Sequence, residues 1–225
     1  MRRYGHSIHW RLLDGVPEDE RREILQVARR RTFARNEVVC HRGDPADSCH
    51  LISAGRFAVR TMTPMGDTVT IAIRGPGATF GEMALLAEDG TRSATVAALE
   101  KGETFSIYRG DFDRIRAKYP NAERFLWEFL VNEVRMLNDR LLEALYVPVD
   151  RRVRRRLVEL AELYGGEDVS PVTVPLTQEV LAELAGATRP TVNQVLRDEE
   201  KRGAIALERG KTTILDVDSL RGRAR

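Results

Sequence analysis

Three polar residues in the glycine-bounded segment Phe80–Val96 have side chains that suit a sugar phosphate. The segment reads FGEMALLAEDGTRSATV and places Glu82 ten residues before Arg92, which Ser93 follows. A carboxylate accepts hydrogen bonds from sugar hydroxyls, and a guanidinium binds phosphate through two parallel hydrogen bonds. The serine hydroxyl and the backbone N–H groups after Gly81 would add donors to the phosphate. These types and spacings fit a cyclic sugar phosphate, while pairing of the two charges across a surface turn fits the spacing as well.

The residues around this segment predict a β domain. Between residues 32 and 108, short apolar runs such as HLIS, TVTIAI and TFSIY alternate with turn sequences such as RGDPAD, SAGR and RGPG. Turn signals at intervals of roughly 8–12 residues are typical of an all-β barrel or sandwich. Helical periodicity predicts a short helix before it, over residues 17–31, and another after it, over residues 111–118.

Composition excludes several classes of protein. The chain has 225 residues, enough for one sizeable core or two modest ones. It contains no run of about 18 apolar residues to span a membrane, and its N-terminus lacks the apolar run of a signal peptide. Its two cysteines, Cys40 and Cys49, do not form a disulfide framework. We therefore expect a cytoplasmic protein. Its net charge of only +2 is too small to indicate a nucleic-acid partner, so the positions of the charged residues must do so.

A long helix is predicted after the β domain, from Pro120 to about Leu145. Its apolar residues recur at alternating intervals of three and four, the heptad pattern of a helix that packs along a partner helix. The pattern predicts a homodimer, with packing against the β domain through Leu126, Phe129 and Leu142 as the alternative. The residues expected at the dimer interface are Trp127, Leu130, Val134, Leu137, Leu141 and Ala144.

The remainder of the chain predicts a second domain that binds DNA. Residues 176–203 read as a helix, a tight turn and a second helix. Thr177 and Thr188 are the expected N-terminal caps, and Gly186 lies in the turn. Two short strands around residues 208–211 would complete a winged helix-turn-helix.

Pro148 is expected to end the long helix, because proline interrupts the helical hydrogen bonds. We therefore expect three parts in an α+β fold. Residues 1–119 would form an N-terminal helix and the β domain, residues 120–148 a dimerisation helix and hinge, and residues 149–225 the DNA-binding domain.

The motif FGEMALL, followed by RSATV, resembles the phosphate-binding cassette of cyclic-nucleotide-binding domains. Over nearly its full length the chain resembles the CRP/FNR family of bacterial transcription regulators. The resemblance implies a jelly-roll β-roll in which Glu82 binds the ribose 2′-hydroxyl, and an effector that is cyclic AMP or, alternatively, cyclic GMP. The groups implied to bind the phosphate are Arg92, Ser93 and the backbone from Gly81 to the amides of Met83 and Ala84.

The long helix departs from the family at the residues that contact the base. Where the family carries a pair of polar residues that read the adenine, this chain has Leu137 and Asn138. Leu137 also falls on the heptad seam, so Asn138 is the expected base contact. The departure leaves the choice of base open.

The second helix of the helix-turn-helix is the expected recognition helix, because its N-terminal half would meet base edges in the major groove. Arg189 matches the family's base-reading arginine, and arginine most often reads guanine. Pro190 and Gln194 replace a common glutamate and a basic residue, so we expect a different operator. The DNA-binding candidates are Thr177, Gln178, Arg189, Thr191, Asn193, Gln194, Arg197, Arg209 and Lys211. Five of these are expected to contact phosphates: Thr177, Gln178, Arg197, Arg209 and Lys211.

A symmetric dimer predicts a particular kind of DNA partner. Its two recognition helices would bind a pseudo-palindromic operator with half-sites about 10 base pairs apart. By analogy with the family, the loop at residues 165–172 is a candidate contact with RNA polymerase.

Other functions fit the sequence less well. An iron–sulfur regulator needs about four cysteines, and the pairs Cys40–His41 and Cys49–His50 would hold a metal or haem only if their side chains converged. Strand alternation points neighbours to opposite faces, so we expect no metal. No nucleophile-plus-base or Walker-type motif occurs, which predicts no enzymatic activity. The helix-turn-helix disfavours regulation of a partner protein. The main alternative is a regulator that needs no ligand or answers another effector, either a different nucleotide or a redox or metal signal at Cys40 and Cys49.

Overall fold

The structure is a computed structural model that describes residues 8–14, 16–86, 90–165 and 171–225, without the side chains of residues 84, 86, 120–123, 125 and 126. The chain divides into two compact units. The N-terminal unit comprises Met1–Thr61 with Ala72–Arg135, and the C-terminal unit comprises Met62–Ile71 with Met136–Arg225.

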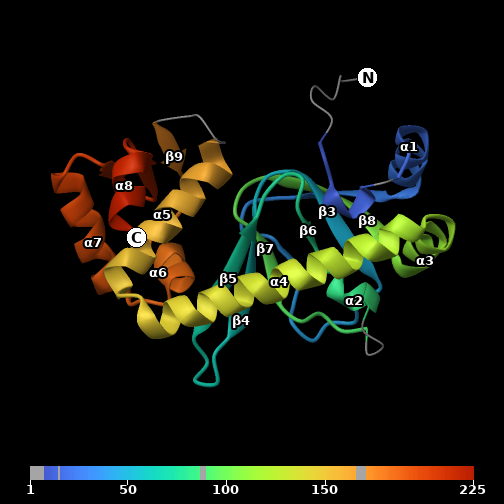
Figure 1. The fold of residues 1–225 in the computed structure, drawn as a ribbon, viewed down its shortest axis with the longest axis horizontal. Coiled ribbons are helices and arrows are strands. Elements are labelled where there is room, and N and C mark those ends of the chain that lie inside the picture. The colour runs from blue at the N-terminus through green and yellow to red at the C-terminus, as the bar shows by residue number, and fades with distance from the viewer. Residues whose placement is uncertain (1–7, 15, 87–89, 166–170) are drawn as a thin grey trace. The chain divides into compact units, whose positions relative to one another are not determined.

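The β domain has two four-stranded sheets (Figure 1), with strand orders β1-β8-β3-β6 and β2-β7-β4-β5. Their strands belong to the N-terminal unit except for the residues of β4 and β5 between 62 and 71. The strand pairs for which a register is described are antiparallel. The predicted barrel or sandwich over residues 32–108 is thereby confirmed. The strands are β1 Arg29–Phe33, β2 Val38–Cys40, β3 Ser48–Ala54, β4 Phe57–Met62, β5 Thr68–Arg74, β6 Thr79–Phe80, β7 Thr95–Ala98 and β8 Gly102–Tyr108.

Strand β3 runs through the core and is buried on both faces. Cys49 and Leu51 pack in one apolar cluster with Trp10, whereas Ile52 packs in a second cluster with Phe57. Burying an aliphatic or aromatic side chain of this size contributes about 1.5–3 kcal/mol. The two clusters fix β3 in place, and β6, which pairs with β3, leads directly into the sugar-phosphate segment.

The prediction of a helix over residues 17–31 is partly wrong. Helix α1 spans Glu18–Val27, and Arg29–Phe33 forms the edge strand β1. Five residue pairs join this strand to β8, from Arg29 opposite Ser106 to Phe33 opposite Gly102. Long-range pairing therefore outweighs local helix propensity, and arginines on an exposed edge strand discourage pairing with another chain.

Three further helices belong to the N-terminal unit, and a fourth begins in it. They are the 3-10 helix η1 Arg11–Leu13, the short α2 Met83–Leu86, α3 Arg109–Lys118 and the long α4 Pro120–Tyr146. Helix α4 is unbroken over 27 residues and is the longest element in Figure 1. The prediction of a helix from Pro120 to about Leu145 is confirmed.

The C-terminal unit contains the predicted winged helix-turn-helix. Its helices are α5 Val149–Gly165, α6 Gln178–Ala185, α7 Arg189–Lys201 and α8 Val217–Arg223. The wing is a sheet of order β10-β11-β9, formed by β9 Val172–Val174, β10 Ile205–Glu208 and β11 Lys211–Ile214. The sequence analysis did not predict β9 or α8, although Asp216 accepts a hydrogen bond from the Ser219 N–H at 2.9 Å and so caps α8.

Two predictions from the sequence concern membrane spans and the loop that would contact RNA polymerase. None of the helices in the described part of the chain has the length and apolar character that a membrane span requires. The loop expected to contact RNA polymerase lies outside the described residues at positions 166–170.

Candidate nucleotide and DNA sites

The turn after β6 brings the chain close to a buried guanidinium. Gly81 has a φ of 83°, in the left-handed region that favours glycine. A Cβ at this position would lie 2.3 Å from Nη1 of Arg92 and 3.2 Å from the carbonyl oxygen of Ser48. The glycine therefore provides the space in which the Arg92 side chain lies.

Arg92 is held in a fixed position at the start of β3. Its Nη1 donates to the Ser48 carbonyl oxygen at 2.7 Å and its Nη2 donates to the Ser48 hydroxyl at 3.2 Å. The side chain is buried, whereas the neighbouring Ser93 is exposed, with its hydroxyl 3.7 Å from the sulfur of Met83. A guanidinium has five N–H donors, so these two bonds leave others for an anion.

Glu82 is a buried carboxylate with an unpartnered oxygen. The residue is 9% exposed, and its Oε2 has no hydrogen-bond partner among the described residues. Burial raises the pKa of Glu82 to about 7, and the nearby charges of Arg74 and Arg92 oppose this only in part. A buried acceptor without a donor is costly to the fold, so this group fits a ligand that supplies a hydroxyl donor.

Glu82 lines a cavity of about 400 Å³, within the range of roughly 300–1,000 Å³ that is typical of small-molecule sites. An ion pair of 2.6 Å between Arg74 of β5 and Glu133 of α4 lies on its wall. The other lining residues include Arg11 and Asp14 near η1, and Phe129 and Asn132 of α4.

The cavity wall contains residues that the sequence analysis did not predict. Arg74, Asn132 and Glu133 line it, whereas Asn138, the predicted base contact, lies beyond Arg135 in the other unit and is exposed. Asn132 follows Phe129 by three residues and Glu133 follows it by four, so one face of α4 meets the cavity. This helical spacing could have indicated in the sequence that Asn132 and Glu133 share a face with Phe129. The heptad repeat of the same helix is the stronger periodic signal and drew attention to the opposite set of residues.

Glu82→Gln is expected to make the nucleotide-free N-terminal unit more stable at pH 8 by on the order of 3 kcal/mol. The folded pKa of Glu82 is about 7 against an ordinary 4.5. Between these values the folded state binds more protons than the unfolded state, so stability falls as pH rises and the loss is complete above pH 7. Denaturant unfolding followed by fluorescence reports this unit, because both tryptophans, Trp10 and Trp127, belong to it. Parallel pH profiles for parent and variant would show that Glu82 titrates normally.

The surroundings of Cys40, Cys49 and His50 do not favour a metal or redox site. His50 is buried, hydrogen-bonds the Thr104 hydroxyl at 3.0 Å and stacks on Phe80, on the face of β3 opposite Cys49. Burial raises the pKa of Cys49 to about 12 and also raises the pKa of Cys40. Protonated thiols are poor nucleophiles and poor metal ligands, so a redox or metal role is not favoured.

The helix-turn-helix is defined by two caps and one glycine. The Thr177 hydroxyl accepts from the Val180 N–H and the Thr188 hydroxyl accepts from the Thr191 N–H, each at 3.4 Å. Gly186, with a φ of 57°, ends α6 in the left-handed conformation. These three positions are the ones predicted for the two caps and the turn.

The predicted DNA-binding residues of α6 and α7 fall into two groups, one exposed to solvent and one that makes hydrogen bonds between or within these helices. Arg189, Gln194 and Arg197 are exposed on α7, whose opposite face is buried through Val192 and Leu196. The second group makes contacts within the unit: the Thr191 hydroxyl bonds that of Thr188 at 2.8 Å, and the Asn193 amide donates to Gln178 Oε1 at 3.1 Å. The exposed group has the geometry for base or phosphate contacts, whereas the second group holds α6 and α7 together.

The wing presents two basic residues at its tip. Arg209 is exposed beside Gly210, which has a φ of 76° in the turn between β10 and β11. Lys211 is half-buried and pairs with Glu208 at 2.9 Å. Both residues remain candidates for phosphate contacts.

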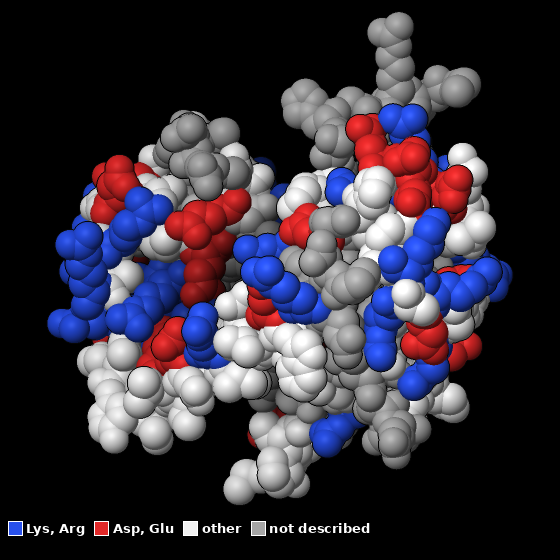
Figure 2. All heavy atoms as spheres, turned by 45° about the vertical axis from the view of Figure 1, so that its right-hand side comes forward, with Lys and Arg blue, Asp and Glu red and all other residues white. Residues whose placement is uncertain are grey.

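On the face of the molecule shown in Figure 2, Lys and Arg side chains are interspersed with Asp and Glu. This mixture agrees with the net charge of only +2. Attraction to DNA must therefore come from local groups such as the exposed arginines of α7 rather than from a uniformly basic surface.

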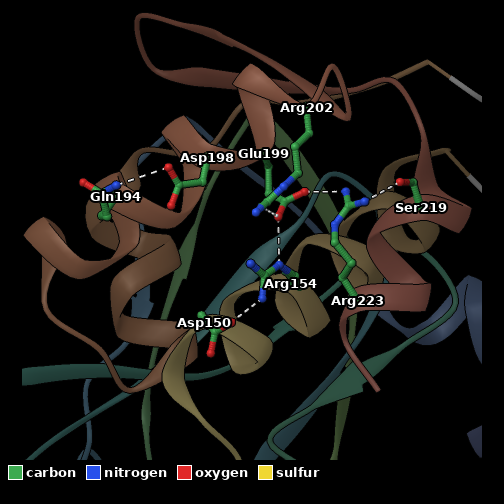
Figure 3. A network of polar contacts seen from close by, with 8 residues as sticks. All are labelled: Asp150, Arg154, Gln194, Asp198, Glu199, Arg202, Ser219 and Arg223. Carbon is green, nitrogen blue, oxygen red and sulfur yellow. Dashed lines mark hydrogen bonds and ion pairs between the residues drawn. The ribbon is translucent and has the colours of Figure 1, made fainter.

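A buried carboxylate fixes the rotation of α7. Glu199 is fully buried and accepts hydrogen bonds from Arg154 Nε of α5 at 2.8 Å and from Arg202 Nη1 at 3.0 Å, and Arg223 of α8 contacts its second oxygen (Figure 3). Burial alone would raise the pKa of Glu199, but the hydrogen bonds from Arg154 and Arg223 outweigh it and hold the pKa below its ordinary value. Arg154 also contacts Asp150, so the network extends from the start of α5 to the recognition helix.

Helix α4 carries a row of exposed apolar side chains. Leu137 and Leu141 are 57% and 58% exposed, and they belong to a contiguous apolar patch, which is more informative than a single exposed leucine. Of the predicted interface residues, Trp127, Val134 and Ala144 are also exposed and Leu130 is half-buried. Val131 and Leu145 add to the same row. Exposed apolar patches of this kind mark interaction sites.

Comparison with known proteins identifies both domains. Residues 30–119 match the cyclic nucleotide-binding domain family, and residues 151–223 match the Crp-like helix-turn-helix domain family. A CRP-like cAMP-activated global transcriptional regulator of Mycobacterium tuberculosis is 31% identical over 195 residues, which cover 86% of this chain and 87% of that protein. The cyclic AMP receptor protein of Thermus thermophilus is 27% identical over 206 residues, covering 92% and 93% of the two chains. The crystal structure of a CRP-family transcriptional regulator from Thermus thermophilus superposes with a TM-score of 0.72 at 25% identity, covering 86% of this chain and 96% of that one.

A domain of the cyclic nucleotide-binding family, followed by a long helix and a Crp-like winged helix-turn-helix, defines a DNA-binding transcription regulator. The chain belongs to the CRP/FNR family of bacterial transcription regulators. Its full-length relatives are transcription regulators rather than enzymes.

Proposed function

We propose that this protein is a homodimeric, sequence-specific transcription regulator that is switched by cyclic AMP bound in its β-roll. The observation that carries the proposal is Glu82, a buried carboxylate with an unpartnered oxygen on the wall of a cavity of about 400 Å³. A ribose hydroxyl would supply the missing donor. The names of two relatives, in Mycobacterium tuberculosis and Thermus thermophilus, refer to cyclic AMP and support this choice of effector.

Among the described cassette residues only Glu82 lines this cavity, and the residues that follow it in the cassette would supply the contacts with the cyclic phosphate. By the pattern of the family, Arg92 and Ser93 bind the cyclic phosphate together with the N–H groups of Met83 and Ala84. Arg92 is already oriented by Ser48, so little side-chain entropy is lost when it binds an anion. For the base, Asn138 retains the position implied by the family, and Asn132 offers a second amide on the cavity wall.

Dimerisation is proposed along the exposed apolar row of α4. Pairing of two copies through Leu137 and Leu141 would bury side chains that are more than half exposed in one chain. In this arrangement residues 1–119 serve as the nucleotide-binding domain, residues 120–148 as the dimerisation helix and hinge, and residues 149–225 as the DNA-binding domain. Contact of the 165–172 loop with RNA polymerase is part of the same proposal.

The continuity of α4 supports coupling between the two sites. One helix lines the cavity through residues between 128 and 133, carries the apolar row and ends at Tyr146, three residues before α5 of the DNA-binding domain begins. If nucleotide favours one arrangement of the paired DNA-binding domains, operator DNA must tighten nucleotide binding by the same factor.

Arg92→Ala is expected to weaken binding of cyclic AMP by about 30- to 100-fold, because a charge-assisted, bidentate contact with the phosphate is lost. Calorimetric titration with cyclic AMP and cyclic GMP measures the effect. Arg92→Lys should recover little of the affinity, since an ammonium group cannot bind two oxygens in parallel. The matched control is Arg114→Ala on the exposed face of α3, which should bind as the parent does. If Arg92→Ala keeps the parent affinity, the proposed phosphate site is wrong.

The full proposal is tested by selecting operators from random DNA with and without cyclic AMP. We expect a pseudo-palindrome whose half-sites lie about 10 base pairs apart, bound more tightly when nucleotide is present. Equal operator affinity in both conditions would support the alternative of a ligand-independent regulator or a different effector. Selection of DNA without two-fold symmetry would contradict the dimer.

A further inference from the structure

The exposed face of α7 carries an amide whose orientation is fixed by a neighbouring carboxylate. Gln194 Nε2 donates to Asp198 Oδ1 at 3.2 Å, one helical turn further along (Figure 3). Gln194 is exposed and lies opposite the buried stripe formed by Val192, Val195 and Leu196. A glutamine amide has two N–H donors and one carbonyl acceptor. With one N–H on Asp198, the second N–H and Oε1 remain to face a base.

That remaining pair is complementary to adenine. In the major groove adenine presents an acceptor at N7 and a donor at N6, whereas guanine presents acceptors at both N7 and O6. An amide that offers one donor and one acceptor side by side matches adenine twice and guanine only once. An unconstrained glutamine could rotate its amide and adapt to other bases.

Asp198 removes that freedom. Rotation of the Gln194 amide by half a turn would place its carbonyl oxygen against the Asp198 carboxylate, so two acceptors would face each other without a proton between them. The hydrogen bond to a carboxylate is also stronger than one between neutral groups. Asp198 therefore acts as a positioning residue that keeps Gln194 in the orientation that favours adenine.

Contacts with α5 and α8 fix the rotation of α7 about its axis, and so fix the direction in which its exposed face points. Glu199, next to Asp198, is fully buried and bonds Arg154 of α5 at 2.8 Å, and it also contacts Arg223 of α8. Turning α7 about its axis would break these bonds and expose the apolar stripe. The neighbouring Pro190 has no side-chain hydrogen bond to offer, which leaves Arg189 and Gln194 as the polar side chains at the exposed N-terminal part of the helix.

We propose that Gln194, oriented by Asp198, reads an A·T pair in each half-site of the operator, in addition to the G·C pair read by Arg189. This inference rests on the proposed function, because it requires that the protein bind a symmetric operator through α7.

The experiment is operator selection with the full chain and saturating cyclic AMP, repeated for the variants. The parent should select adenine at one symmetric position per half-site. Gln194→Ala should lose the preference at that position by about tenfold to a hundredfold and keep it elsewhere. Gln194→Arg should change the preferred pair at the same position to G·C. Arg189→Ala should instead relax a different position, and Arg209→Ala should weaken all sequences alike.

Asp198→Asn separates positioning from a merely structural role. It should reduce the discrimination of adenine from guanine at the Gln194 position while leaving the preference at the Arg189 position unchanged. Asp218→Asn on α8 is the matched control, since it removes the same charge from an exposed residue that pairs only with Arg221 among the described residues, and it should not alter discrimination. A selected palindrome in which no position responds to Gln194→Ala would overturn the inference and leave DNA binding intact. Failure to select any palindrome would overturn both the inference and the proposed function.

Discussion

Glu199→Ala is expected to lower the free energy of unfolding of the C-terminal unit by about 3–5 kcal/mol. Glu199 is fully buried and is the common acceptor for Arg154, Arg202 and Arg223. Its removal would leave the guanidinium of Arg154, which is only 8% exposed, without its partner on α7. Asp150, whose side chain is 45% exposed, would compensate this charge only in part, and removing one partner of a buried ion pair is strongly destabilising. Urea unfolding is followed in parallel by far-UV circular dichroism, which reports the helices of both units, and by tryptophan fluorescence, which reports the N-terminal unit alone, so a transition seen only by circular dichroism belongs to the C-terminal unit.

The adjacent residue provides the control. Glu200 accepts a hydrogen bond from the Leu207 N–H at 3.1 Å and is half-buried. Glu200→Ala should cost only about 1 kcal/mol. Tryptophan fluorescence, which reports the N-terminal unit, should not change in either variant. Equal stabilities of the two variants would show that the arginines of the Glu199 network do not depend on their shared carboxylate.

Leu137→Asp is expected to convert the proposed dimer into a monomer, with the dissociation constant raised by at least about a hundredfold. Leu137 is 57% exposed in the middle of the apolar row of α4. In a symmetric dimer the substitution would place two carboxylates across the seam, where each would lose hydration without gaining a partner. Sedimentation at micromolar concentration distinguishes the two states.

Leu142→Asp is the matched control for this experiment. It makes the same substitution on the same helix at a residue that is 55% exposed and that lies off the heptad seam. We expect the control to remain a dimer. A parent protein that sediments as a monomer would contradict dimerisation along α4, whatever the variants do.

The elements that the sequence predicted well are those whose signals are local. The cap residues Thr177 and Thr188 and the turn residue Gly186 lie within twelve positions of one another, so propensity and spacing define the helix-turn-helix without tertiary information. Glu82 and Arg92 also come from one continuous segment and are both buried, while their role in binding a nucleotide stays a prediction. Heptad spacing likewise predicted α4 almost to its last residue.

The elements that the sequence predicted poorly depend on partners far away in the chain. Residues 29–31 were assigned to a helix, but pairing with β8, more than seventy residues later, makes them a strand. Arg154 and Glu199 are 45 positions apart, and neither shows in sequence that it will be buried. The wall of the cavity that Glu82 lines combines Arg74 from β5 with Glu133 from α4, a pairing set by the fold and not by spacing.

Because Cys49 is buried, the rate at which its thiol is alkylated can report how often the β-roll opens. Its thiol is inaccessible in β3 and has a pKa of about 12, so an alkylating reagent can modify it only in molecules whose β-roll has come apart. The sequence places no cysteine after Cys49, hence none in the C-terminal unit. In the Cys40→Ser variant, Cys49 is the one remaining thiol, so the rate of its alkylation measures opening of the β-roll. If cyclic AMP slows this reaction, the ratio of the two rates measures how far the nucleotide stabilises the closed β-roll.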